Sequence, residues 1–172
     1  MLRIARLVCV LAVFAVTENA ATTITPVQPT LKSGCYEISN AAELYGFAAI
    51  VKGTDGFAKD STACGKLTRD IVVNQNVLNS DGSLNVADTA NFAKWPMIGP
   101  YYGKFDGQLH TVSGLYYSSE AATYSGLFHS AVSSYYDSVG AEIRNVGVIG
   151  SFFRVGYSVG GLTSFPNASI SG

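Results

Sequence analysis

The sequence predicts an all-β protein: a right-handed parallel β-helix, or solenoid, with a short N-terminal capping helix. Between residues 104 and 172, short apolar runs alternate with glycine, and a Gly-Leu step returns at Gly114, Gly126 and Gly161. Such runs are too short for helices and are typical of short strands, while glycine permits sharp corners between them. Stacked coils would bury their inward side chains against one another. An antiparallel sandwich, which also has many short strands, stays open as the alternative.

The first 21 residues have the pattern of a secretory signal peptide. Arg3 and Arg6 precede an apolar run from Leu7 to Val16, and small residues follow that run. The run is about half as long as the roughly 20 apolar residues that a membrane-spanning helix needs. We therefore expect residues 1–21 to be removed, and the rest of the chain to be secreted or held at the cell surface without a membrane span.

Composition divides the remaining chain into three parts. Residues 22–34 are rich in Thr and Pro and are expected to form a linker or a first edge strand. Residues 35–99 are expected to form an N-terminal cap region that contains one helix and a disulfide. Residues 100–172 carry the repeat-like runs, which stop inside a coil. The chain is therefore expected to be truncated, or to cover its open end by end-to-end self-assembly.

The predicted helix lies at about residues 40–52. Asn40 and Glu43 have the spacing of a capping box, and Gly53 is placed to end the helix. Four apolar residues fall on one helical face, namely Leu44, Phe47, Ala48 and Val51. We expect this face to cover the first coil of the solenoid, because an open coil exposes unpaired strand edges. A partner-binding face is the alternative.

Two cysteines remain after removal of the signal peptide, because Cys9 lies inside it. Cys35 and Cys64 in an exported chain are predicted to form a disulfide, with two unpaired thiols as the alternative. Farther along, Leu67 and the residues 71–73 predict a strand, and Trp95 is expected to pack the cap region against the repeats.

The repeat-like block contains four recognisable motifs: Tyr102 to Leu115, Gly126 to Phe128, Ile143 to Val148, and Val159 to Leu162. These motifs resemble the opening of the repeats in bacterial GLUG-repeat proteins, and a segment like 36–48 often precedes such repeats. The resemblance implies a secreted or surface protein built on a β-helix. The chain departs from the family pattern at Leu109, His129 and Ser164, where glycine is usual.

No catalytic, metal or cofactor site is predicted. The two histidines are His110 and His129; Ser130 beside His129 would point to the opposite face of a strand. Asp106 and His110 are expected to serve turn hydrogen bonding and packing. A net charge of −1, with 13% charged residues, argues against nucleic acid or an anionic membrane surface as a partner.

Aromatic residues occur as adjacent pairs, in which one member would face outward from a strand. Tyr102, Tyr117 and Tyr136 are the candidates for a stacked outward row that binds a glycan or a surface protein. Filling of core and edge space is the alternative.

The sequence thus predicts an exported, non-catalytic β-helix scaffold for surface adhesion or ligand binding. Two further hypotheses remain. The chain is the N-terminal fragment of a carbohydrate-active β-helix enzyme, or it is a degenerate, truncated copy without an independent function.

Overall fold

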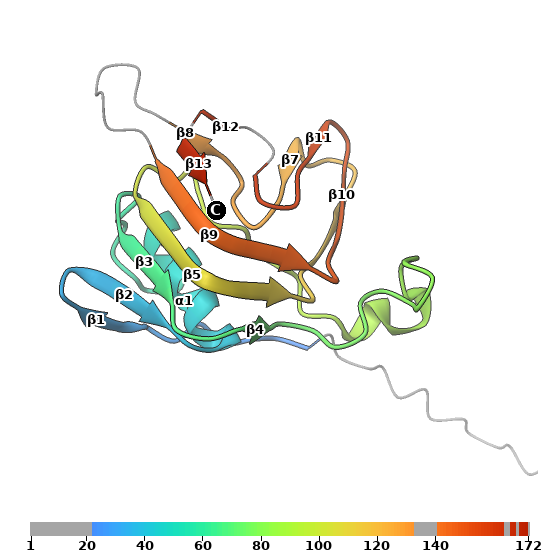
Figure 1. The fold of residues 1–172 in the computed structure, drawn as a ribbon. Coiled ribbons are helices and arrows are strands. Elements are labelled where there is room, and N and C mark those ends of the chain that lie inside the picture. Colours follow the sequence, from blue (N-terminus) through green and yellow to red (C-terminus); the bar gives the residue numbers. More distant parts are fainter. Residues whose placement is uncertain (1–21, 133–140, 164–165, 168, 172) are drawn as a thin grey trace, which may run out of the picture.

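The computed structural model describes residues 22–132, 141–163, 166–167 and 169–171. In Figure 1 a curved sheet lies over the helix α1 (Ala41–Lys52), and shorter strands lie near both ends of its longest strands. The predicted signal peptide, the residue Tyr136 and the position Ser164 lie outside the described residues.

The largest element is a mixed sheet of seven strands in the order β1-β2-β3-β5-β9-β13, with β4 paired to β5. The first pair, β1 with β2, is antiparallel, and the other pairs are parallel. The strands are β1 (Thr30–Lys32), β2 (Cys35–Ile38), β3 (Cys64–Leu67), β4 (Ile71–Val72), β5 (Lys104–Ser113), β9 (Glu142–Ile149) and β13 (Ser169–Ser171).

The remaining strands form three two-stranded parallel sheets. They pair β6 (Tyr116–Ser119) with β10 (Phe152–Val155), β7 (Tyr124–Ser125) with β11 (Ser158–Val159), and β8 (Ala131–Val132) with β12 (Pro166–Asn167). A short 3₁₀ helix, η1 (Val86–Asn91), lies in the long connection between β4 and β5. The predicted strand near residues 67–73 is thus present as the end of β3 and the short strand β4.

The predicted helix is confirmed as α1 (Ala41–Lys52). The Asn40 side chain accepts a hydrogen bond from the Glu43 N–H, and the Glu43 carboxylate accepts one from the Ser39 N–H. Gly53 has a φ of 72° and its N–H donates to the Ala49 carbonyl, which is the left-handed helix end that glycine favours.

The N-terminal segment runs closely across α1. The Val27 N–H donates to the Ala42 carbonyl at 2.9 Å, and a side chain on Gly46 would overlap the Val27 carbonyl. Gly46 therefore allows a close backbone approach in the middle of the helix, although glycine there lowers intrinsic helix stability.

Gly46→Ala is expected to destabilise the protein by about 1–3 kcal/mol, because the added methyl group overpacks the contact with Val27. In an open helix the same change would stabilise by up to about 1 kcal/mol. Denaturant unfolding, followed by circular dichroism, measures whether the free energy of unfolding falls or rises. Ala41→Gly, at the first helical position, is the control and should cost no more than about 1 kcal/mol. A more stable Gly46→Ala variant would contradict the close packing.

The core lies between α1, the inner face of the large sheet and the first short strands. Phe47 of α1 contacts Tyr101 and Phe105, and Phe105 contacts Phe128. All four aromatic side chains are fully buried. The helix is therefore part of the main core.

The predicted all-β, right-handed parallel β-helix is wrong. The described residues form a mixed α/β fold, in which the large sheet contains an antiparallel pair and neither closes nor continues as a solenoid. Alternation of apolar runs with glycine indicates where short strands lie, but it does not determine which strands pair. The capping role assigned to the helix face falls with the β-helix. Leu44 and Phe47 are buried, as expected of that face, but they pack in the core shared with the mixed sheet and not over a solenoid coil.

Candidate functional site

The outer face of the large sheet carries charged side chains in a row across four strands. Glu37 of β2 pairs with Lys66 of β3, Lys66 with Asp106 of β5, and Asp106 with Arg144 of β9. Phe105 and Gly107, on either side of Asp106, are buried, and so is Ile143, the residue before Arg144. Because side chains alternate between the faces of a strand, this row points away from α1.

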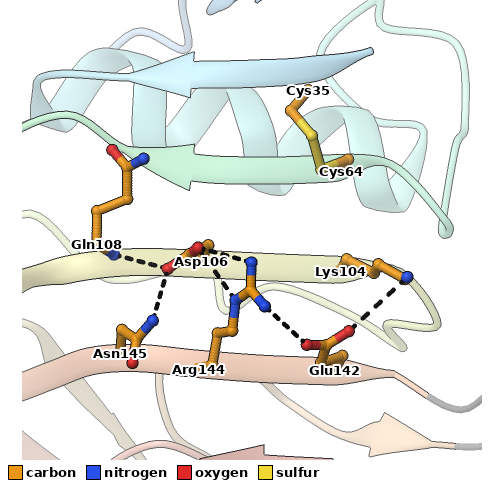
Figure 2. A network of polar contacts seen from close by, with 8 residues as sticks. All are labelled: Cys35, Cys64, Lys104, Asp106, Gln108, Glu142, Arg144 and Asn145. Atoms are coloured by element: carbon orange, nitrogen blue, oxygen red, sulfur yellow. Dashed lines mark hydrogen bonds and ion pairs between the residues drawn. A yellow bond between two sulfur atoms is a disulfide. The ribbon is translucent and has the colours of Figure 1, made fainter. Parts of the chain in front are cut away.

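Two further charges, Lys104 of β5 and Glu142 of β9, face each other two residues before Asp106 and Arg144. Arg144 contacts Asp106 at 3.0 Å and Glu142 at 3.3 Å, and Lys104 lies 3.8 Å from Glu142. Figure 2 shows that Arg144 lies between the two carboxylates, with Lys104 at the far side of Glu142. Arg144 is therefore the central cation of this network.

Asp106 is held at the point where β5 and β9 change register. Its carboxylate accepts hydrogen bonds from the Gln108 N–H at 2.9 Å and from the Asn145 side-chain amide at 3.2 Å (Figure 2). Partial burial by itself would raise the pKa of Asp106. These hydrogen bonds and the Arg144 guanidinium outweigh burial, so the pKa lies below its ordinary value. The turn hydrogen bond predicted for Asp106 is present.

These charges and the disulfide surround a surface pocket of about 260 Å³. Gly65 of β3 pairs with Phe105 of β5, and the residues just before this pair are Cys64 and Lys104. The short half-cystine side chains leave room between the longer side chains around them. The pocket is lined by Cys35, Cys64, Gly65, Lys66, Lys104, Phe105, Asp106, Glu142 and Arg144.

The pocket presents three cationic side chains and two carboxylates. Lys66 is 3.1 Å from Glu37, which lies beside the pocket. The hydrogen bond from Lys66 is the largest cause of the lowered pKa of Glu37. The Lys104 side chain is 68% exposed and has only a long contact with Glu142. Lys104 is therefore the cation best placed to meet an anionic group from solvent.

The predicted disulfide between Cys35 and Cys64 is confirmed. The two cysteines face each other directly across β2 and β3. Among the described residues, no helix is long and apolar enough to cross a membrane. In that same part of the chain, no group of three or more His, Cys, Asp or Glu residues is placed to hold a metal ion.

The predicted stacking tyrosines are placed differently from one another. Tyr102 is half-buried and its N–H donates to the Ser61 carbonyl. Tyr117 packs against the core, and the Lys94 ammonium lies 4.8 Å above its ring. Tyr136 lies outside the described residues. The predicted role of the three tyrosines in ligand stacking stays a prediction.

An aromatic row does exist, but it is formed by other residues. Tyr116 stacks on Phe152 of the neighbouring strand at 6.2 Å, and Phe92 contacts Tyr116 at 5.3 Å. Leu115 is fully buried, so alternation along the strand turns Tyr116 outward and Tyr117 inward. Stacked rings cover one another's faces and leave mainly their edges for a ligand.

His129 and Ser130 are closer than expected. The His129 Nδ1 lies 3.3 Å from the Ser130 Oγ, because these residues lie outside the strands and the segment bends. Ser130 is only 8% exposed, so a substrate has no direct access to its hydroxyl group. Burial, followed by the nearby Lys52 charge, lowers the pKa of His129. His110 lies 3.5 Å from Asp70, on the side of the sheet near β4.

The charged residues of the pocket were not identified as a site from the sequence. The available signal was the spacing of Lys104 and Asp106 around Phe105, and of Glu142 and Arg144 around Ile143. A charge on each side of a buried apolar residue indicates a strand with one charged face. Recognition of the pocket also required the pairing of β3, β5 and β9.

No protein-family model, no curated protein and no solved structure matches this chain. The resemblance to GLUG-repeat proteins therefore supports a proposal only. The function must be argued from the geometry of the pocket and from the sequence.

Proposed function

We propose that this chain is an exported, non-catalytic binding protein that holds an acidic sugar of a surface glycan in the pocket beside the disulfide. The signal-like residues 1–21 and the resemblance to bacterial GLUG-repeat proteins support a secreted or surface location. The largely exposed Lys104 ammonium at the pocket supports an anionic ligand.

The main support for the proposal is that the charged side chains of the pocket are unequally paired. Both carboxylates in the pocket already contact Arg144, whereas the Lys104 ammonium is largely exposed. A guanidinium has five N–H donors on three nitrogens. The Nε and Nη2 atoms of Arg144 contact Asp106 and its Nη1 atom contacts Glu142, so these contacts occupy one N–H group of each nitrogen. Two N–H donors of Arg144 and the Lys104 ammonium are therefore left to bind a ligand carboxylate.

The two carboxylates do not resemble the acid–base pair of a glycoside hydrolase. Such an enzyme needs one carboxyl group that stays protonated until it donates its proton to the leaving group. The pKa of Asp106 is shifted in the opposite direction, and Glu142 is bound to the same arginine. This pair supports recognition of a ligand rather than cleavage of a glycosidic bond.

Lys104→Ala is expected to weaken the binding of a uronic-acid oligosaccharide about tenfold or more, because a charge-assisted hydrogen bond contributes about 1.5–3 kcal/mol. Calorimetric titration measures the dissociation constant, and the affinity should fall as salt is added. Lys32→Ala is the matched control. Its side chain is 67% exposed and lies 3.5 Å from a glutamate, but it does not line the pocket.

Three results would contradict the proposal. They are equal affinity for the neutral oligosaccharide of the same length, equal losses for the Lys104 and Lys32 variants, and no binding of the acidic oligosaccharide at low salt. Slow cleavage of the oligosaccharide by the wild-type chain would instead favour the enzyme hypothesis.

A further inference from the structure

The Cys35–Cys64 disulfide forms part of the wall of the charged pocket. Both cysteines line the pocket of about 260 Å³, and both are only half-buried. Leu67 of β3 is fully buried, so alternation along the strand turns Cys64 toward the outer face of the sheet. Access to the sulfur atoms is one of the factors that decide whether a disulfide reacts with thiols, and exposed disulfides are the labile ones.

Lysines lie on both sides of the disulfide. Lys32 of β1 pairs with Cys35 of β2, and directly opposite residues of an antiparallel pair have their side chains on the same face. On the other side, the register of β3 and β5 places Cys64 opposite Lys104. The Lys32 and Lys104 side chains are 67% and 68% exposed. The disulfide therefore lies between two exposed lysines in one row across four strands.

Positive charge is in excess around the disulfide. The ion pairs on this face join four cationic side chains to three carboxylates, namely Lys32, Lys66, Lys104 and Arg144 to Glu37, Asp106 and Glu142. The two lysines that flank the disulfide have the longest of these contacts, at 3.5 Å for Lys32 and 3.8 Å for Lys104. An excess of positive charge raises the local concentration of anions, so an anionic thiol is favoured over a neutral one.

We propose that this disulfide is a site of thiol–disulfide exchange with a low-molecular-weight thiol that carries a carboxylate, and that the thiol becomes bonded to Cys64. The thiol enters the pocket, and its carboxylate binds the Lys104 ammonium. Cys64 is the cysteine on that side, because β3 lies between β2 and β5 (Figure 2). The pocket is slightly smaller than the usual site for a drug-sized ligand, which suits a small thiol.

The exchange step conserves atoms and electrons. The thiolate sulfur of the incoming molecule attacks the Cys64 Sγ, a new S–S bond forms, and the bond between Cys64 and Cys35 breaks. Its electron pair leaves with the Cys35 Sγ, which then takes a proton from water. The Lys32 ammonium, opposite Cys35, stabilises the negative charge that develops on this sulfur atom. The incoming sulfur is oxidised and the Cys35 sulfur is reduced, so no other oxidant or reductant is needed.

The first measurement is whether the folded chain reacts. The full chain, produced with its disulfide formed, is treated with 3-mercaptopropionate, and the adduct is followed by mass spectrometry after quenching at mildly acidic pH. The rate should stay constant over all urea concentrations at which circular dichroism shows a folded chain. A rate that rises with urea as steeply as the unfolding constant means that attack requires unfolding. That result, or no adduct at all, would overturn the proposal.

The second measurement isolates the charge of the thiol. The rate with 3-mercaptopropionate is divided by the rate with neutral 2-mercaptoethanol, because the intrinsic reactivity of each thiol is the same toward every variant. Lys104→Gln should lower this ratio at least about fivefold, the effect of one attraction between unit charges in contact in water. Added salt should lower the ratio of the wild type. An unchanged ratio for Lys104→Gln would contradict binding of the carboxylate in the pocket.

Lys94→Gln is the matched control and should leave the ratio unchanged. Lys94 is also exposed, but it is bridged to Tyr116, which follows the far end of β5, and it does not line the pocket. Equal losses for the Lys94 and Lys104 variants would mean that only the overall charge of the chain matters, which also contradicts the proposal.

Peptide mapping identifies the modified sulfur atom. N-ethylmaleimide, added with the quench, should label Cys35, and the adduct should be found on Cys64. An adduct on Cys35 with a labelled Cys64 would overturn the assignment. All these measurements are made without a sugar, so failure of the exchange and failure of acidic-sugar binding can be told apart.

Discussion

Trp95→Ala is expected to lower the free energy of unfolding by about 3–5 kcal/mol, the usual range for removing a large aromatic side chain from a core. Trp95 is fully buried and packs edge-on against Tyr45 of α1 at 5.2 Å. Its indole N–H lies within hydrogen-bonding distance of the Gly126 and Leu127 carbonyls, at 3.1 and 3.2 Å. One side chain thus connects the helix to the turn before Phe128.

Circular dichroism must follow the unfolding of this variant, because Trp95 is the only tryptophan and provides the fluorescence signal. Trp95→Phe separates the contribution of aromatic packing from that of the indole N–H hydrogen bonds. It keeps an aromatic ring and loses the N–H donor, so it should lose clearly less stability than Trp95→Ala. A loss below about 2 kcal/mol for the alanine variant would mean that the structure closes around the cavity.

Removal of the Cys35–Cys64 disulfide is expected to cost about 3.5 kcal/mol, because the bond closes a loop with a sequence separation of 29 residues. The loop contains all of α1, so a reduced unfolded chain gains the freedom of the whole helical segment. The double variant Cys35→Ala and Cys64→Ala, unfolded in guanidinium chloride, measures the loss.

Two comparisons make this measurement specific. The wild type treated with a reductant should unfold at the same denaturant concentration as the double variant. The reductant should have no effect on the double variant itself. A difference below about 1 kcal/mol between the wild type and the double variant would show that β2 and β3 are held mainly by their backbone pairing.

Local features of this chain could be predicted from its sequence because their causes are local. Asn40, Glu43 and Gly53 specify the two ends of α1 within a short segment, and the structure has the corresponding caps. The disulfide followed from two cysteines in a chain that carries an export-like segment. Burial of Trp95 followed from its size and its place between two regions.

The fold class and the pocket could not be predicted, because both depend on pairing between distant strands. Nothing near Lys66 in the sequence indicates that Asp106 becomes its neighbour. Gly46 was overlooked for a related reason: its function depends on the N-terminal segment that crosses α1. Which of Tyr116 and Tyr117 faces outward depends on the burial of Leu115 in the core, which the sequence alone does not show.

The charged row on the sheet also bears on how the strands find their alignment. If β5 slid by two residues along β3, every side chain would keep its face and the apolar pattern would be preserved. That slip would place Lys104 opposite Lys66, two like charges. The same slip of β9 along β5 would place Glu142 opposite Asp106. Like charges directly across a strand pair are destabilising. The alternation of sign along the row therefore penalises misaligned pairings that burial alone would tolerate.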